Sequence, residues 1–332
     1  MRFTLPAPRL LGEARQQSRG HAPIAEIFIF IIVFLVGNLL AGFLQIPAVV
    51  VLGQDTLAEL FAAAASGDLA NIDVYIDRFV TEISTNPMIT LVSLFTFAAL
   101  IACTFFYCTR LEKRRLATLG FRKRRAAREY LVGLAAGVGS FGAAALFCVL
   151  TGTLTFQGPS FDGALGLIAL FLLGFLIQGL AEEVLCRGYF LVSLARRQSL
   201  PVAVLVSSLA FAAMHGLNQG ITPLALLNLV LFGVFAAVYL LKRGDIWGIA
   251  AFHTAWNFAQ GNVFGISVSG AARMPSLFSF APSGSDALIN GGAFGLEGGL
   301  AVTLVCTAGI VVLLLTRTRE PDRTAVGGQW AA

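Results

Sequence analysis

The amino-acid sequence predicts an all-α protein, a polytopic transmembrane helical bundle of about eight spans. The chain has 332 residues, of which 57% are hydrophobic and only 12% are charged. A soluble domain carries about 25% charged residues, so this composition excludes an ordinary soluble fold. Apolar runs of the length that crosses a bilayer, about 20 residues, recur along the whole chain. The basic residues gather between alternate runs, and this pattern predicts how the chain is threaded.

Eight apolar stretches are the predicted spans: 24–44, 87–109, 130–151, 164–186, 200–216, 222–241, 246–261 and 298–316. The fourth is expected to stay helical to about residue 196, and the seventh is short for a span. No small-residue cleavage site follows the first stretch, so we interpret it as an uncleaved helix and not as a signal peptide. Three regions are therefore expected: a polar tail (1–23), the bundle (24–317) and a second tail (318–332).

The positions of the charged residues set the orientation. Of the 23 Lys and Arg residues, twenty lie in the N-terminal tail, the 110–128 loop, Arg196–Arg197, Lys242–Arg243 and the C-terminal tail. With eight spans these five places share one side of the membrane. The loops on the other side hold nine acidic residues and two arginines. Basic loops stay in the cytoplasm, so we expect both tails to be cytoplasmic, in the plasma membrane of a bacterium.

The loops and the third span carry three further predictions. The 110–128 loop has nine basic residues, which we expect to contact anionic lipid headgroups; we expect no nucleic-acid partner. The acidic 53–86 loop is expected to hold a short interfacial helix around residues 56–65. In the third span, the spacing of Gly133 and Gly137 predicts a close approach of a neighbouring helix.

Ionisable side chains inside the predicted spans are the strongest indication of function, because such groups are costly in a bilayer. Glu183 and Arg187 are four residues apart and can pair on one helix face, which leaves Glu182 as the freer carboxylate. A buried carboxylate that is not neutralised by a cation can act as a general base. We therefore expect a structural pair and a catalytic Glu182.

Helix rise predicts that a histidine meets Glu182. Glu182 lies fourteen residues before Arg196, and His215 lies fifteen residues after Leu200 on the next helix. At 1.5 Å per residue, Glu182 and His215 both lie about 21–22 Å from the same turn. Phe211, one turn before His215, is expected to wall the pocket.

The seventh span carries two further polar groups. His253 and Asn257 are four residues apart and share a helix face, and Asn257 lies fourteen residues past Arg243, at a similar depth. Two hydrogen-bond donors on one face suit the stabilisation of an oxyanion. Polar contacts between helices would use the same residues, so a structural role is the alternative.

These residues resemble the CAAX prenyl proteases of the Rce type and the bacteriocin-processing proteases, the CPBP or Abi family. Its motifs E-E-x-x-x-R, F-x-x-x-H and H-x-x-x-N are present in order, at 182–187, 211–215 and 253–257. The resemblance implies an intramembrane endopeptidase with its catalytic region at about 160–262. It further implies that Glu182 and His215 activate a water and that His253 and Asn257 hold the oxyanion. The substrate would be a peptide or protein, lipid-modified or membrane-bound.

The sequence leaves a metal ion open. Glu182, His215 and His253 could supply three zinc ligands. We favour a mechanism without a cofactor, because the H-E-x-x-H pairing of zinc sites is absent and a glutamate-activated water needs no metal. The five cysteines lie in apolar segments without metal-site spacing and are expected to be free thiols.

Two other classes of function compete with the protease. A non-catalytic scaffold or immunity-type binding protein could keep the same fold, although it would not need the full polar set. Intramembrane Glu and His residues also mark transporters and proton relays, but these often have inverted repeats, and the sequence shows none.

Overall fold

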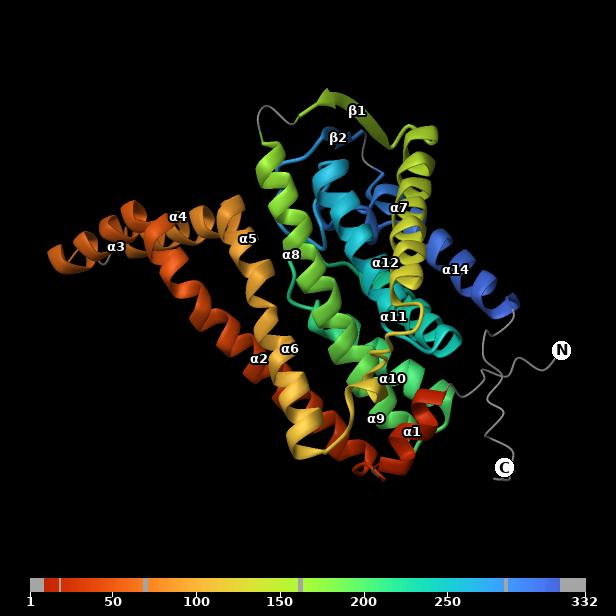
Figure 1. The fold of residues 1–332 in the computed structure, drawn as a ribbon. Helices are drawn as coiled ribbons and strands as arrows, with labels where there is room; N and C mark the ends of the chain where they lie inside the picture. Colours follow the sequence, from red (N-terminus) through yellow and green to blue (C-terminus); the bar gives the residue numbers. More distant parts are fainter. Residues whose placement is uncertain (1–8, 18, 68–70, 161–163, 284–285, 317–332) are drawn as a thin grey trace.

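The protein is described from a computed structural model, in which residues 9–17, 19–67, 71–160, 164–283 and 286–316 are described. It is a helical bundle with one helical hairpin that projects from its side (Figure 1). The helices are α1 (Arg9–Gln17), α2 (Pro23–Leu52), α3 (Gln54–Ser66), α4 (Ile72–Thr85), α5 (Pro87–Thr96), α6 (Ala98–Phe106), α7 (Ala126–Leu150), α8 (Leu165–Glu183), α9 (Val192–Ala195), α10 (Leu200–Met214), α11 (Pro223–Arg243), α12 (Trp247–Phe258), α13 (Ala287–Asn290) and α14 (Leu300–Leu315). The strands are β1 (Leu154–Pro159) and β2 (Phe278–Pro282), which pair antiparallel.

The predicted helical membrane bundle is confirmed. Each of the eight predicted stretches contains a helix, and the fourth runs from Leu165 to Ala195, close to the expected end at residue 196. Among the described residues, five helices are long and apolar enough to cross a membrane, whereas α10 and α14 are shorter apolar helices. The total of eight spans and the cytoplasmic position of the tails stay predictions. Residues 1–8 and 317–332 of those tails lie outside the described residues.

Helix α12 lies in the middle of the bundle, between α7 and α8 (Figure 1). All ten residues from Gly248 to Asn257 are buried. A helix surrounded by protein needs neither the length nor the uniform hydropathy of a lipid-facing span. This position explains why the seventh stretch is short and only weakly apolar.

Glycines let the neighbouring helices approach α12. A Cβ atom at Gly133 would lie 2.0 Å from the carbonyl oxygen of Gly248, and one at Gly137 would lie 2.5 Å from that of Phe252. On the other side, a Cβ at Gly179 of α8 would lie 2.9 Å from the backbone nitrogen of Thr254. The close packing predicted from the Gly133–Gly137 spacing is therefore present.

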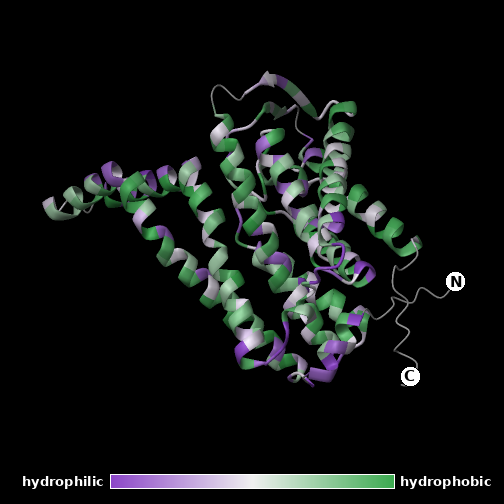
Figure 2. Ribbon diagram, in the orientation of Figure 1, coloured by the Kyte–Doolittle hydropathy of each residue, from purple (hydrophilic) through white to green (hydrophobic). Residues whose placement is uncertain are grey.

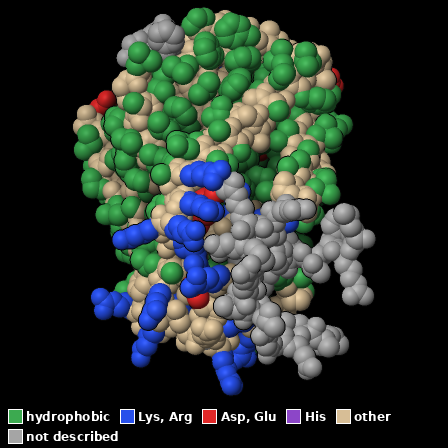
Figure 3. Space-filling model, turned by 45° about the vertical axis from the view of Figure 1, so that its right-hand side comes forward, with side chains coloured by type: hydrophobic (Ala, Val, Ile, Leu, Met, Phe, Trp, Pro, Cys, Tyr) green, Lys and Arg blue, Asp and Glu red, His purple; other side chains and the backbone are tan. Residues whose placement is uncertain are grey.

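The two ends of the bundle differ in charge and structure. Lys and Arg side chains gather at one end, whereas hydrophobic side chains cover most of the remaining surface in this view (Figure 3). The ribbon is correspondingly polar in the loops at the basic end and largely apolar along the helices (Figure 2). Strands β1 and β2, which the sequence did not predict, cover the opposite end (Figure 1).

The acidic 53–86 loop contains two helices where one was expected. Helix α3 matches the predicted helix around residues 56–65, and α4 follows it. Together they form the hairpin that projects from the side of the bundle beyond α2 and α5 (Figure 1). No residue of α4 is fully buried, because the helix packs mainly against α3 beside the bundle.

Candidate active site

Four polar residues of the three motifs meet around one cavity of about 180 Å³ inside the bundle. Glu182 stands near the end of α8, His215 at the end of α10, and His253 and Asn257 on α12. All four line the cavity, with Phe211 as part of its wall. The wall also includes residues of α5 and α11 and of the loops that follow α10 and α12.

Glu182 is buried, and its two carboxylate oxygens have different surroundings. Oε1 accepts a hydrogen bond of 2.7 Å from the side-chain amide of Gln178, one turn earlier on α8. Oε2 is buried and has no hydrogen-bond partner. It lies 3.9 Å from Nε2 of His215 and 3.7 Å from Nε2 of His253. The structure thus brings together the carboxylate and both histidines, at separations too long for direct hydrogen bonds.

The end of α10 orients His215. The last carbonyl groups of a helix lack partners within the helix, and here the carbonyl oxygen of Phe211 lies 2.9 Å from Nδ1 of His215. A carbonyl oxygen only accepts, so Nδ1 carries the proton and Nε2 of the neutral ring is an acceptor. In its neutral form, His215 therefore presents an unprotonated nitrogen towards Glu182.

Glu183 and Arg187 form the predicted pair, and His253 joins them. Oε1 of Glu183 lies 3.2 Å from Nη1 of Arg187 and 2.9 Å from Nδ1 of His253. The carboxylate accepts the Nδ1 proton, which fixes the ring of His253 with Nε2 towards Glu182. Arg187 lies in a π-helical segment, Val184–Leu191, which continues α8; such segments are frequent at functional sites.

Phe211 lies between the buried pair and the cavity. The guanidinium carbon of Arg187 lies 4.3 Å from the centre of the Phe211 ring, which is the arrangement of a cation–π contact. The same ring lies tilted against the ring of His215, at a centroid distance of 4.9 Å. Phe211 therefore separates the cation of Arg187 from the cavity that Glu182 faces.

Gln178 is a site residue that the sequence analysis missed. It donates to Glu182, and its own side-chain oxygen accepts a hydrogen bond of 3.0 Å from Nδ2 of Asn257. The three side chains form a chain from α12 to the carboxylate. In the sequence, Gln178 is recognisable as a single amide in an apolar span, four residues before Glu182. The motif begins at Glu182, so only residues after it were considered as its partners. Asn257 keeps its second N–H for another partner.

The side chains do not fit a zinc site at Glu182, His215 and His253. Ligand atoms of one tetrahedral zinc lie about 3.4 Å apart, given metal distances of about 2.0–2.1 Å. Among the described residues, the three-residue group whose donor atoms all lie within 4.8 Å of one another is a different one, His21, Glu26 and Glu112. Oε2 of Glu182 lies 3.9 and 3.7 Å from Nε2 of His215 and of His253, farther apart than the ligand atoms of one tetrahedral zinc. All five cysteines are free.

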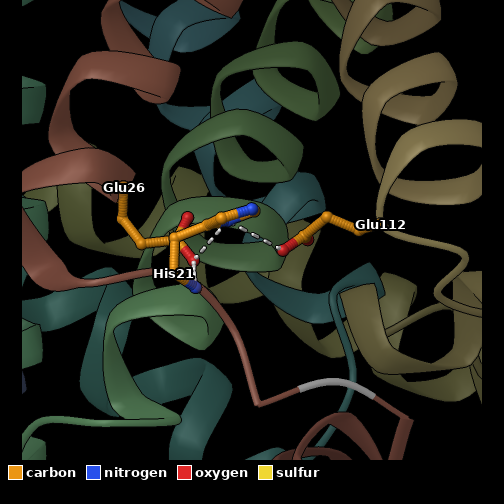
Figure 4. Close-up of side chains that lie close together, drawn as sticks. All are labelled: His21, Glu26 and Glu112. Atoms are coloured by element: carbon orange, nitrogen blue, oxygen red, sulfur yellow. Dashed lines mark hydrogen bonds and ion pairs between the residues drawn. The ribbon is translucent and has the colours of Figure 1, made fainter.

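The group of His21, Glu26 and Glu112 places one imidazole beside two carboxylates (Figure 4), with Nδ1 of His21 at 3.4 Å from Glu26 and 3.8 Å from Glu112. Arginine already neutralises its carboxylates. Nη2 of Arg196 lies 3.0 Å from Oε1 of Glu26 and 2.5 Å from Oε1 of Glu112, and Arg114 pairs with the other oxygen of Glu112 at 3.0 Å. These buried ion pairs join α2 to the end of α9, so the group is structural and disfavours a cation.

A second polar cluster lies in the wall of the same cavity. Nε1 of Trp256 donates to Glu297 at 3.2 Å, and Ser269 donates to the other oxygen of Glu297. Asn228 of α11 donates to the backbone carbonyl of Glu297 at 2.8 Å. Trp256 occupies a variable position of the third motif (253–257), whereas the other residues of this cluster lie outside the motifs. Glu297 comes from the short turn that precedes α14.

Comparison with protein families gives a match over residues 164–259, to the family described as Type II CAAX prenyl endopeptidase Rce1-like. The matched range contains all three motifs. Searches of curated proteins and of solved structures gave no match. The match and the five apolar helices together indicate an integral membrane protein. The resemblance predicted from the motifs is thus confirmed: residues 164–259 of this chain match the Rce1-like family, and this match points to a CAAX-type endopeptidase.

Proposed function

We propose that this chain is an intramembrane endopeptidase in which Glu182 and His215 activate a water. The observation that carries the proposal is the unpaired Oε2 of Glu182, which faces two imidazole nitrogens at 3.9 and 3.7 Å. Two acceptors at such a separation can share one water that hydrogen-bonds to both. The water would donate to Glu182 Oε2 and to His215 Nε2, which is an acceptor in the tautomer set by Phe211.

The proposed reaction is the hydrolysis of a peptide bond. Glu182 takes a proton as the water oxygen bonds to the substrate carbonyl carbon, which gives a tetrahedral oxyanion. The remaining N–H of Asn257 and the Nε2 of a protonated His253 donate to that oxyanion. The C–N bond then breaks, and the proton returns to the leaving amine. Glu183 orients His253, and Gln178 orients Asn257, each through one hydrogen bond.

The first test compares newly formed peptide termini in membranes that contain the wild type or Glu182→Gln at matched levels. Glutamine keeps the size of the side chain but cannot take the proton. Glu59→Gln is the control, because Glu59 is half-exposed on α3, outside the cavity. We expect termini that appear with the wild type and the control only. Identical profiles for all three inserted proteins would favour the non-catalytic scaffold.

A mechanism without metal is part of the proposal. It rests on the separations of the three donor groups, which are too large for one ion without side-chain movement. We expect a strong chelator to leave cleavage by the purified protein unchanged. One tightly bound zinc per chain, lost in Glu182→Ala, would contradict this part of the proposal and leave the protease assignment intact.

The basic 110–128 segment is proposed to bind anionic lipid headgroups. Seven of its nine basic side chains are exposed, while Arg114 is buried in its ion pair and Arg122 pairs with Glu13. Clusters of exposed basic residues next to a span attract anionic lipids. A bacterial plasma membrane as the location agrees with this reading, and membrane fractionation of the native cells would test it.

A further inference from the structure

Glu297 lies beyond the matched region, in a short helical turn (Leu296–Gly298) that precedes α14, and it lines the cavity that Glu182 faces. Only 9% of the residue is exposed. The cavity therefore holds a second carboxylate, contributed by a part of the chain that the family match does not cover.

Three hydrogen-bond donors hold this carboxylate in place. Oε1 accepts from Nε1 of Trp256 at 3.2 Å. Oε2 accepts from the backbone nitrogen and the hydroxyl of Ser269, at 2.8 and 2.6 Å. Hydrogen bonds to an ionised acceptor are among the strongest in proteins. Ser269 adopts a left-handed backbone with φ 48°, a strained conformation for a residue with a side chain, and both of its donors meet Glu297 as a result.

Glu297 lacks the cationic partner that the other buried glutamates have. In the described part of the chain, the buried Glu26, Glu112, Glu129 and Glu183 each pair with an arginine, and Glu182 faces two histidines. For Glu297, no ion pair is found among the described residues. A buried carboxylate without a counter-charge is unfavourable, and this one lines the cavity.

We infer that Glu297 is a specificity-determining residue that pairs with a cationic group of the substrate. This inference rests on the proposed protease function. The group is an ammonium or guanidinium, on a Lys or Arg side chain or at a free amino terminus, next to the bond that is cleaved. Trp256 and Phe232 also line the cavity, and aromatic rings attract a cation that enters it. A substrate with an acidic group at this position would be rejected by like charge.

The test measures kcat/KM for synthetic peptide pools in detergent-solubilised full-length protein. In the first pool the peptides are N-acetylated, and the residue next to the cleaved bond is Lys, Arg, Gln, norleucine or Glu. The second pool contains the same peptides with a free amino terminus. We expect wild type to prefer a cationic peptide over its Gln counterpart by at least about tenfold, the weight of one charged hydrogen bond. In Glu297→Gln the ratio should fall to near one. A preference confined to the free-terminus pool would assign the cation to the amino terminus.

Asp245→Asn is the matched control, because Asp245 is a buried acid that does not line the cavity, and it should keep the wild-type ratio. Cleavage by the wild type without cationic preference, or a preference that Glu297→Gln retains, would overturn this inference alone. Absence of any cleavage by wild type would overturn the proposed function, and this inference with it.

A measurement on the wild type covers the case in which Glu297→Gln does not fold. Hexylamine, which is cationic at neutral pH, and hexanol, its neutral counterpart, are compared as inhibitors of peptide cleavage. We expect hexylamine to inhibit at a concentration at least about tenfold lower than hexanol. Equal inhibition by both compounds would contradict a carboxylate that pairs with the substrate.

Discussion

The contact between α7 and α12 gives a prediction whose size follows from the structure. A Cβ atom at Gly133 would lie 2.0 Å from the oxygen of Gly248, whereas real Cβ atoms essentially never come closer than 3.0 Å. The obstacle is backbone, so no side-chain rotation relieves it, and α7 and α12 must separate by about 1 Å. We expect Gly133→Ala to destabilise the fold by about 3 kcal/mol or more, the upper range of overpacking in a core.

The same displacement reaches the candidate active site, because α12 carries His253 and Asn257. A misplacement of about 1 Å can lower a catalysed rate by about 10²-fold. Gly139→Ala is the matched control on the same helix, since a Cβ there would meet nothing within 4 Å. This control should gain about 0.5–1 kcal/mol from the helix preference of alanine.

Thermal unfolding of the detergent-purified variants measures the effect on stability, and peptide cleavage measures the effect on the site. We expect a Tm several degrees below wild type for Gly133→Ala and at or above wild type for Gly139→Ala. The reasoning would be refuted by equal Tm values for the two variants, or by a Gly133→Ala protein with wild-type stability and turnover.

Three further predictions concern the hydrogen bonds, the pH dependence and the lipid contacts. Gln178→Leu and Asn257→Ala should each lower kcat about 10–100-fold without loss of fold. Both variants break the same series of hydrogen bonds to Glu182, so their effects should not add in the double variant. Additive losses would contradict this hydrogen-bonded series. Burial, with the nearby charge of Glu129, raises the pKa of Asp245 to about 6, so the folded state keeps a proton that the unfolded chain releases from about pH 4, and stability should fall as the pH rises through this window. The free energy of unfolding should fall by about 3 kcal/mol at most. Asp245→Asn keeps an acceptor for the backbone nitrogens of Trp247 and Gly248, so its Tm should not fall over this pH range. Parallel curves of Tm against pH for the two proteins would count against the raised pKa. Replacing Lys123, Arg124 and Arg125 with glutamine should lower the share of anionic lipid that copurifies with the protein, measured by mass spectrometry, and an unchanged share would remove the lipid proposal.

Much of the bundle could be predicted from the sequence, because apolar length and charge are local properties. The helix ends at Ala195 and Met214 lie within two residues of the expected ends. Helix rise predicted that Glu182 lies near His215, because the first helix ends and the second begins at one turn, and the structure brings these side chains within 4 Å. The spacing of Glu183 and Arg187 similarly predicted their contact.

The remaining features depend on tertiary contacts that the sequence does not display. The partners of β1 and β2 are more than a hundred residues apart, so their pairing has no local signal. Glu297 reaches the cavity only because the loop after α12 folds back over it. The buried ion pairs of Arg196 likewise join segments from three distant parts of the chain. Each feature arises from long-range packing, which periodicity and composition do not encode.

The adjacent carboxylates of α8 give a last prediction, on the separation of stability from chemistry. Neighbouring residues on a helix point about 100° apart, so Glu183 meets Arg187 and His253 while Glu182 faces the cavity. Arg187 is held by Glu183 and by the ring of Phe211, and its charge therefore does not neutralise Glu182.

Glu183→Ala would leave the guanidinium of Arg187 buried without its counter-charge, which costs about 3–5 kcal/mol. We expect this variant to lose Tm and turnover together, whereas Glu182→Gln should lose turnover at a nearly unchanged Tm. Equal Tm losses in the two variants would contradict the division of roles. A helix that uses one carboxylate to neutralise its own arginine leaves the next one free to take a proton, and for this reason the acidic pair is more informative about function than either residue alone.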